Sequence, residues 1–137
     1  MSFRMEVFHR IGNFNIELGR IGGNLLGGEE KDLFYRIYAL GDYRVKYVPT
    51  AIVYHCVPME RTKKDFIIRQ ALGTGSSERI RAKNENTFVM ALFREGIKWL
   101  GSLVLCVQFI LKNQWPKGKM IVLFRYWVSR GLLFENR

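Results

Sequence analysis

The stretch GGNLLGGEEKDLFYRI, residues 22–37, places two glycine pairs before three acidic residues and then continues in an apolar pattern of helical spacing. Leu33, Ile37 and Leu40 lie on one face of such a helix, and Gly41 is typical of the residue at which a helix ends. The stretch therefore predicts a flexible loop followed by a helix of about three turns.

The segments on either side of this stretch have different periods. Residues 3–11 have apolar side chains at helical spacing, and the six glycines of residues 12–28 predict a loop that bends closely around something. Apolar and polar residues alternate in DYRVKYVP, residues 42–49, and the following TAIVYH, residues 50–55, is β-branched and apolar. Residues 42–55 therefore predict a strand pair, or a bent strand broken at Pro49.

The second half of the chain is mostly helical in its pattern. Residues 62–83 predict a basic helical region interrupted by Gly73 and Gly75. Residues 86–112 predict a long apolar helix, which the Trp-Pro segment breaks before a last helix over residues 120–134.

The charge of the chain is unevenly distributed. The formal net charge is +10, with 7 basic and 6 acidic residues in residues 1–59 and 15 basic and 6 acidic residues in residues 60–137. An anionic partner would therefore meet the second half.

Cys56 and Cys106 form no CxxC pair and the N-terminal residues resemble no secretory signal, so a reducing, cytoplasmic setting is expected.

The long apolar helix has features of a membrane-surface element. Its uncharged core, Trp99 to Leu111, has 13 residues, fewer than the roughly 20 that span a bilayer. A helical hairpin in the interface of an anionic membrane is one interpretation, and burial of the apolar faces on a partner domain is the other. The membrane interpretation is based on three tryptophans that alternate with basic residues. The tryptophans are Trp99, Trp115 and Trp127, and the basic residues are Lys98, Lys112, Lys117, Lys119, Arg125 and Arg130.

The acidic cluster also has two interpretations. Glu29, Glu30 and Asp32 at a helix N-terminus are stabilised by the helix dipole, which explains one or two acids as capping residues. A catalytic carboxylate needs to take a proton from a bound hydroxyl, and glycines directly before the acids would give a substrate access to them. Three acids behind four glycines favour the catalytic interpretation.

The stretch MSFRMEVFHRIGNFNIELGRIGGNLLGGEEKDLFYRIYALGDYRVKYVPTAIVYHCVP resembles the C-terminal half of the catalytic domain of family 2 glycosyltransferases, the inverting GT-A class. The shared features are an aromatic-arginine helix with a Gly-Phe-type turn, a glycine loop, a Gly-Gly-Glu-Asp-like motif, an arginine, and a strand of the form Y-x-P…H. The resemblance covers residues 1 to about 80.

The resemblance implies a role for individual residues. Glu30 would be the base that deprotonates the acceptor hydroxyl, and Glu29 would hydrogen-bond the acceptor. The loop that contacts the acceptor would contain Gly27, Gly28, Asp32 and Arg36. His55 would belong to the metal or diphosphate site. The phosphate oxygens would be contacted by Arg61, Lys63 and Lys64. Gly22 and Gly23 belong to the same loop, and Arg36 would pair with Glu29 or Asp32, or be solvated.

Two departures from the family pattern limit what the resemblance implies. Glu30 stands where the family has aspartate, which moves the carboxylate by roughly 1.5 Å. The N-terminal half, with its βαβ series and Asp-x-Asp pair, is missing from this sequence. We therefore expect a fragment that is inactive by itself and that needs Mn²⁺ or Mg²⁺ only together with the missing half.

The expectations combine into an α/β protein of two parts. Residues 1–83 would be the acceptor-side half of a GT-A domain, and residues 84–137 a basic helical hairpin on a membrane surface or against a domain. The function would be transfer of a sugar from a nucleotide-sugar to a glycan or lipid-linked acceptor in cell-surface polysaccharide biosynthesis, at the inner face of the cell membrane. The alternative is a basic module for anionic lipid or RNA, although no RNA-binding signature is present and a nucleic-acid surface would not expose three carboxylates.

Overall fold

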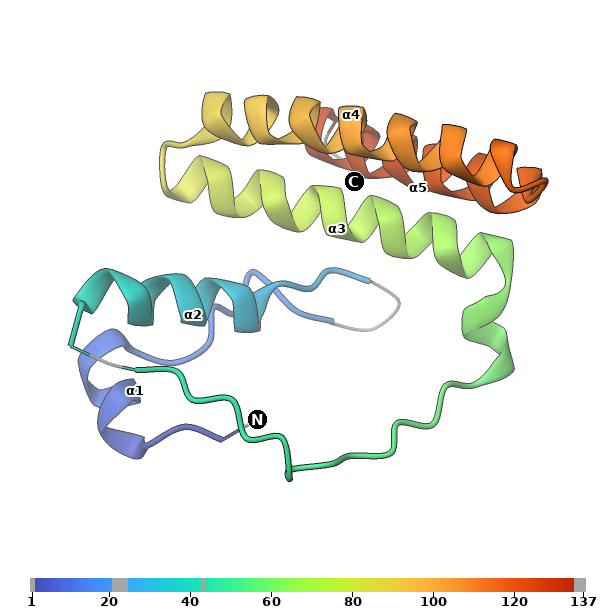
Figure 1. Ribbon diagram of the computed structural model, residues 1–137. Helices are drawn as coiled ribbons and strands as arrows, with labels where there is room; N and C mark the ends of the chain where they lie inside the picture. The colour runs from blue at the N-terminus through green and yellow to red at the C-terminus, as the bar shows by residue number, and fades with distance from the viewer. Residues whose placement is uncertain (1, 21–24, 43, 135–137) are drawn as a thin grey trace.

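The computed structural model describes residues 2–20, 25–42 and 44–134, and these residues form helices joined by loops (Figure 1). The helices, in chain order, are α1 (Met5–Ile11), α2 (Glu29–Leu40), the 3-10 helix η1 (Met59–Thr62), α3 (Lys64–Asn84), α4 (Phe88–Leu111) and α5 (Trp115–Leu133).

The expectation of an α/β fold is wrong for this chain. Within the described ranges no residue belongs to a strand, and so the sheet of a GT-A fold is not formed. Residues 44–57 are exposed and run across the open side of the molecule as an irregular segment (Figure 1). The alternation in this segment favours an extended backbone, but a strand also needs a neighbour to accept its hydrogen bonds, and no described segment pairs with it.

Helices α1 and α2 share a small aromatic core. Val7, Leu33 and Ile37 are buried together, and Leu33 is completely inaccessible to solvent. Edge-to-face and tilted contacts join the rings packed around them, namely Phe3, Phe8, Phe14 and Phe34. The apolar spacing read from the sequence of α2 is thus the face that packs against α1.

Helix α3 is continuous through Gly73 and Gly75, contrary to the interruption expected there. Both glycines allow another backbone to approach the helix. A Cβ atom at Gly75 would collide with the backbone of Val128 and Leu132 in α5, and one at Gly73 with the backbone of Leu25 in the loop. The glycines therefore permit close packing, and this contact offsets their low helix propensity.

Helices α4 and α5 form an antiparallel hairpin above α3 (Figure 1). Helix α5 packs against both α3 and α4, so it holds the three helices together. The break expected between the long helix and the last one is present, since α4 ends at Leu111 and α5 begins at Trp115. The last helix starts five residues earlier than expected because proline suits the first turn of a helix. In the part of the chain that the structure describes, no helix has both the length and the apolar run needed to cross a membrane.

Candidate functional site

A pocket of about 500 Å³ lies between the first turn of α2 and the middle of α3. One wall comes from the glycine loop and the acids, and the other from α3, which lies about 50 positions later in the sequence. The residues that line it are Leu18, Arg20, Gly27, Gly28, Glu29, Glu30, Lys31, Gln70, Thr74, Ser77, Glu78 and Arg81.

The loop is fixed to α3 by a hydrogen-bond relay through Ser77. The backbone N–H of Gly27 donates to Ser77 Oγ at 2.9 Å, and Ser77 Oγ donates to the carbonyl of Gly73 at 2.7 Å. Gly28 precedes the helix with φ of 100°, a conformation that favours glycine, and its carbonyl accepts the first helical bond from Asp32. The first turn of α2 is thereby held against the pocket.

The two glutamates of the first turn have different surroundings. Glu30 is exposed at the pocket wall, whereas Glu29 is half-buried and extends back beneath the loop. The Glu29 carboxyl lies so close to Gly19 that a Cβ atom there would be 3.6 Å from its carbon, and Oε2 is buried without a hydrogen-bond partner. Both glutamates line the pocket, and Glu30 is the more accessible of the two to a ligand.

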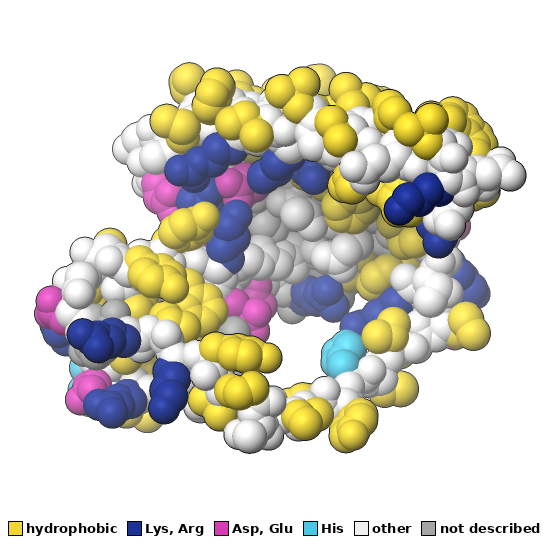
Figure 2. Space-filling model, viewed as in Figure 1, with side chains coloured by type: hydrophobic (Ala, Val, Ile, Leu, Met, Phe, Trp, Pro, Cys, Tyr) yellow, Lys and Arg dark blue, Asp and Glu magenta, His cyan; other side chains and the backbone are white. Residues whose placement is uncertain are grey.

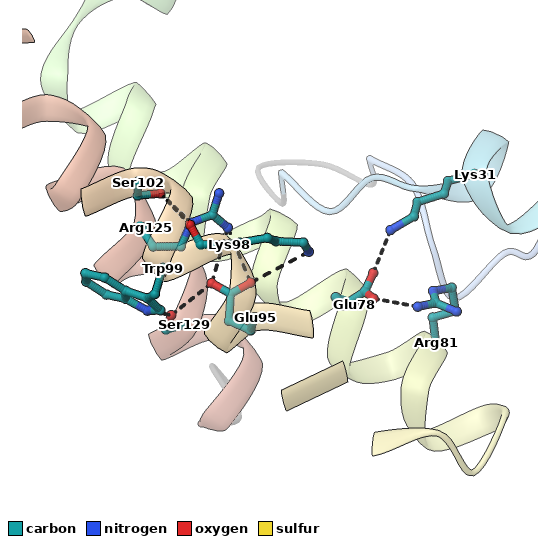
Figure 3. A network of polar contacts seen from close by, with 9 residues as sticks. All are labelled: Lys31, Glu78, Arg81, Glu95, Lys98, Trp99, Ser102, Arg125 and Ser129. Atoms are coloured by element: carbon teal, nitrogen blue, oxygen red, sulfur yellow. Dashed lines mark hydrogen bonds and ion pairs between the residues drawn. The ribbon is translucent and has the colours of Figure 1, made fainter. Parts of the chain in front are cut away.

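A chain of ion pairs crosses the pocket at its other end (Figure 3). Lys31 Nζ lies 3.0 Å from Glu78 Oε2, and Arg81 Nη2 lies 2.5 Å from Glu78 Oε1. Burial alone would raise the pKa of Glu78, but the hydrogen bonds and charges of Arg81 and Lys31 outweigh burial and lower this pKa from 4.5 to about 2. Glu78 is therefore ionised at neutral pH and joins α2 to α3.

Asp32 and Arg36 lie away from the pocket. Arg36 pairs with Asp32 at 2.9 Å, as one of the interpretations of Arg36 expected, and donates to the carbonyls of Ile11 and Asn13. Asp32 is buried by these contacts. The pair fixes the end of α1 to α2, so the structure gives both residues a positioning role in the α1–α2 core.

The residues expected to contact a metal or diphosphate are not brought to this pocket. His55 is exposed on the irregular segment, Arg61 belongs to η1, and Lys63 and Lys64 are exposed at the start of α3. Within the described ranges no cluster of three histidine, cysteine or acidic side chains could hold an ion. The described residues alone therefore offer no ligand set for a divalent cation, and the expectation that Mn²⁺ or Mg²⁺ binds only together with a donor-binding half stays a prediction.

Half of the pocket was not predicted from the sequence. Gln70, Thr74, Ser77 and Arg81 occupy one face of α3 at spacings of three and four residues. This polar stripe is visible in the sequence once residues 64–84 are treated as one uninterrupted helix. Gly22 and Gly23, expected in the loop, lie outside the described residues.

The chain matches no protein-family model, no curated protein and no solved structure.

Proposed function

We propose that the pocket binds the sugar acceptor of an inverting glycosyltransferase and that Glu30 is the general base. The observation that carries the proposal is the placement of Glu29 and Glu30 on the wall of a pocket whose opposite wall carries Gln70 and Thr74. Amide and hydroxyl side chains hydrogen-bond the hydroxyl groups of a sugar, and an accessible carboxylate accepts a proton from one of them. The resemblance of residues 1–80 to family 2 glycosyltransferases supports the same assignment.

In the proposed reaction, an acceptor hydroxyl attacks the anomeric carbon of a nucleotide-sugar. The new C–O bond forms as the bond to the diphosphate breaks, and the hydroxyl proton passes to Glu30. Glu29, whose carboxyl lies next to Gly19, would orient the acceptor. The sequence contains no Asp-x-Asp pair, so in this proposal another polypeptide segment binds the donor and the isolated chain is inactive.

The proposal includes a location, the cytoplasmic face of the cell membrane, where the protein would be peripheral and act in cell-surface polysaccharide biosynthesis. The basic second half of the chain supports this location because anionic lipids attract clustered lysine and arginine. The sugar and the acceptor belong to the classes that the resemblance implies, a nucleotide-linked hexose and a glycan or lipid-linked acceptor.

The test separates acceptor binding from proton transfer. In an NMR titration with oligosaccharides, we expect the amide signals of Gly27, Gly28 and the pocket face of α3 to shift, and Gln70→Ala to weaken the binding about ten-fold. Gln108→Ala, an exposed amide on α4, is the matched control and should bind normally. In membranes in which the chain acts with a donor-binding partner, Glu30→Gln should lower kcat about 100-fold with little change in KM.

Two results would contradict the proposal. One is the absence of any oligosaccharide-dependent shift in the pocket signals at millimolar sugar. The other is near-normal turnover by Glu30→Gln, because a general base cannot be removed without slowing the chemical step.

A further inference from the structure

Helix α4 buries only small or polar side chains fully and exposes a row of large apolar ones. The residues of α4 that are buried in the hairpin are Ala91, Glu95 and Ser102. The opposite side, here called the outward face of α4, consists of apolar residues that are 54% to 81% exposed: Val89, Phe93, Ile97, Leu100, Val104, Val107 and Leu111. Packing in water favours the reverse arrangement.

The polar groups around Glu95 in the hairpin hydrogen-bond one another (Figure 3). Arg125 Nη1 donates to the Glu95 carboxylate at 3.2 Å, and Ser129 Oγ donates to the same carboxylate at 3.0 Å. Trp99 Nε1 donates to Ser129 Oγ at 2.8 Å, and Arg125 Nε donates to Ser102 Oγ at 3.3 Å. These polar groups do not depend on water at the outward face, so an apolar environment there costs the network nothing.

We propose that the outward face of α4 is a docking surface for an anionic lipid bilayer. The helix would lie along the membrane interface, with its apolar residues among the acyl chains and without crossing the bilayer. Figure 2 shows this face as a nearly continuous band of hydrophobic side chains along the edge of the molecule formed by α4. An apolar face of this length is larger than a protein in water normally leaves uncovered.

Charge identifies the occupant as an anionic membrane. Residues 88–134, which comprise α4, the turn and α5, contain seven basic residues and one acidic residue, Glu95, which pairs with Arg125 and Lys98. Lysine and arginine side chains border the apolar band in Figure 2, and Lys112, Lys117 and Lys119 lie around the turn of the hairpin. Trp115 is 57% exposed at this turn, and tryptophan favours the depth of the lipid headgroups.

A second copy of the chain fits this face less well. The spacing of three and four residues along the outward face would suit a two-helix seam. However, a second copy would bring the same surplus of positive charge to the interface, whereas anionic headgroups neutralise it.

Membrane docking leaves the pocket accessible. The pocket lies on the side of α3 that faces α2, and α4 lies on the other side of α3 (Figure 1). The inference names the surface that would produce the peripheral location proposed above. It does not rest on the proposed catalysis, because vesicle binding requires neither a sugar nor Glu30.

The experiment is flotation of the full chain with vesicles of pure phosphatidylcholine or of phosphatidylcholine containing phosphatidylglycerol. We expect flotation with the anionic vesicles, at least ten-fold less with the neutral ones, and partial release in high salt, which screens the charges but not the apolar contact. The double variant Leu100→Glu and Val104→Glu should lower anionic-vesicle binding at least ten-fold.

The matched control is Ile52→Glu and Val53→Glu, which adds the same charge at exposed apolar positions of the irregular segment. This control and Glu30→Gln should both bind vesicles as the unmodified chain does. The proposal is overturned if the unmodified chain does not float, or if both double variants lose binding equally. It is also overturned if sedimentation shows a dimer that only the α4 variant dissociates while flotation stays unchanged.

Discussion

At the scale of single residues, Glu78 connects the two walls of the pocket. It accepts hydrogen bonds from Lys31 of α2 and Arg81 of its own helix, and Arg81 also pairs with Glu85 and lies over the ring of Tyr35 at 4.9 Å. Removal of the Glu78 charge would leave two basic side chains without their shared partner. The pocket therefore depends on the ionisation of one carboxylate that does not itself belong to the glycine loop.

This dependence predicts how stability changes with pH. Because the pKa of Glu78 is about 2 in the folded chain and 4.5 ordinarily, the unfolded chain takes up the proton first as the pH falls. The stabilisation that the ion pairs of Glu78 provide is present above pH 4.5 and is lost as the pH falls toward 2. Thermal unfolding should show Glu78→Gln less stable than the unmodified chain at neutral pH, with the difference disappearing through this window.

Glu60→Gln is the control for this pH experiment because Glu60 is an exposed carboxylate of η1. This variant should follow the unmodified chain at each pH. A stability difference between Glu78→Gln and the unmodified chain that persists unchanged near pH 2 would contradict the assignment of the pKa shift.

At the scale of elements, the contact between α3 and α5 is set by glycine. Gly75→Ala would push a methyl group into the backbone of Val128 and Leu132, and the helices would have to separate. We expect a loss of about 2 kcal/mol in the free energy of unfolding, because overpacking costs more than the gain in helix propensity. Urea denaturation measures this loss directly.

The matched substitution is Gly101→Ala in α4, where a Cβ atom would meet no other atom within 4 Å. This variant should be as stable as the unmodified chain or more stable, by up to about 1 kcal/mol. If the two alanine variants had the same stability, the close packing of α3 against α5 would not be the reason that position 75 requires glycine.

The elements also show how far local sequence determines this fold. The start and face of α2 were predicted correctly from Leu33, Ile37 and the glycines that precede it, because helical spacing is a local property. The strands expected in residues 42–55 were wrong, since alternation is local but pairing is not. Gly75 was interpreted as an interruption of α3 because its contact, the backbone of α5, lies more than 50 positions away.

The candidate site divides in the same way. The loop and acidic wall, with Glu29 and Glu30, was found from adjacent residues. The α3 wall was missed because nothing near Gln70 or Arg81 in the sequence indicates which helix will face them. The contact between the two walls is tertiary, so it cannot be predicted from local sequence patterns.

At the scale of the whole molecule, the described helices form two cores with polar contacts between them. Val7, Leu33 and Ile37 make the core of α1 and α2, whereas Ala82, Ala91 and Leu132 belong to the core of α3, α4 and α5. The connections across the pocket are mainly hydrogen bonds and ion pairs, such as Gly27 to Ser77 and Lys31 to Glu78. Contacts of this kind stabilise less than apolar burial, so each core should respond to its own substitutions.

We therefore predict that the α1–α2 core opens before the three-helix core. A core of so few residues buries little apolar surface, and hydrogen exchange should be faster for the amides of α2 than for those of α3 and α5. Leu33→Ala should accelerate exchange in α1 and α2 while leaving α5 nearly unchanged, and Leu132→Ala should do the opposite, since each leucine is fully buried in its own core. If either variant accelerated exchange equally in α1 to α5, the molecule would be one cooperative unit. The pocket, which lies between the cores, would then be as rigid as the cores themselves.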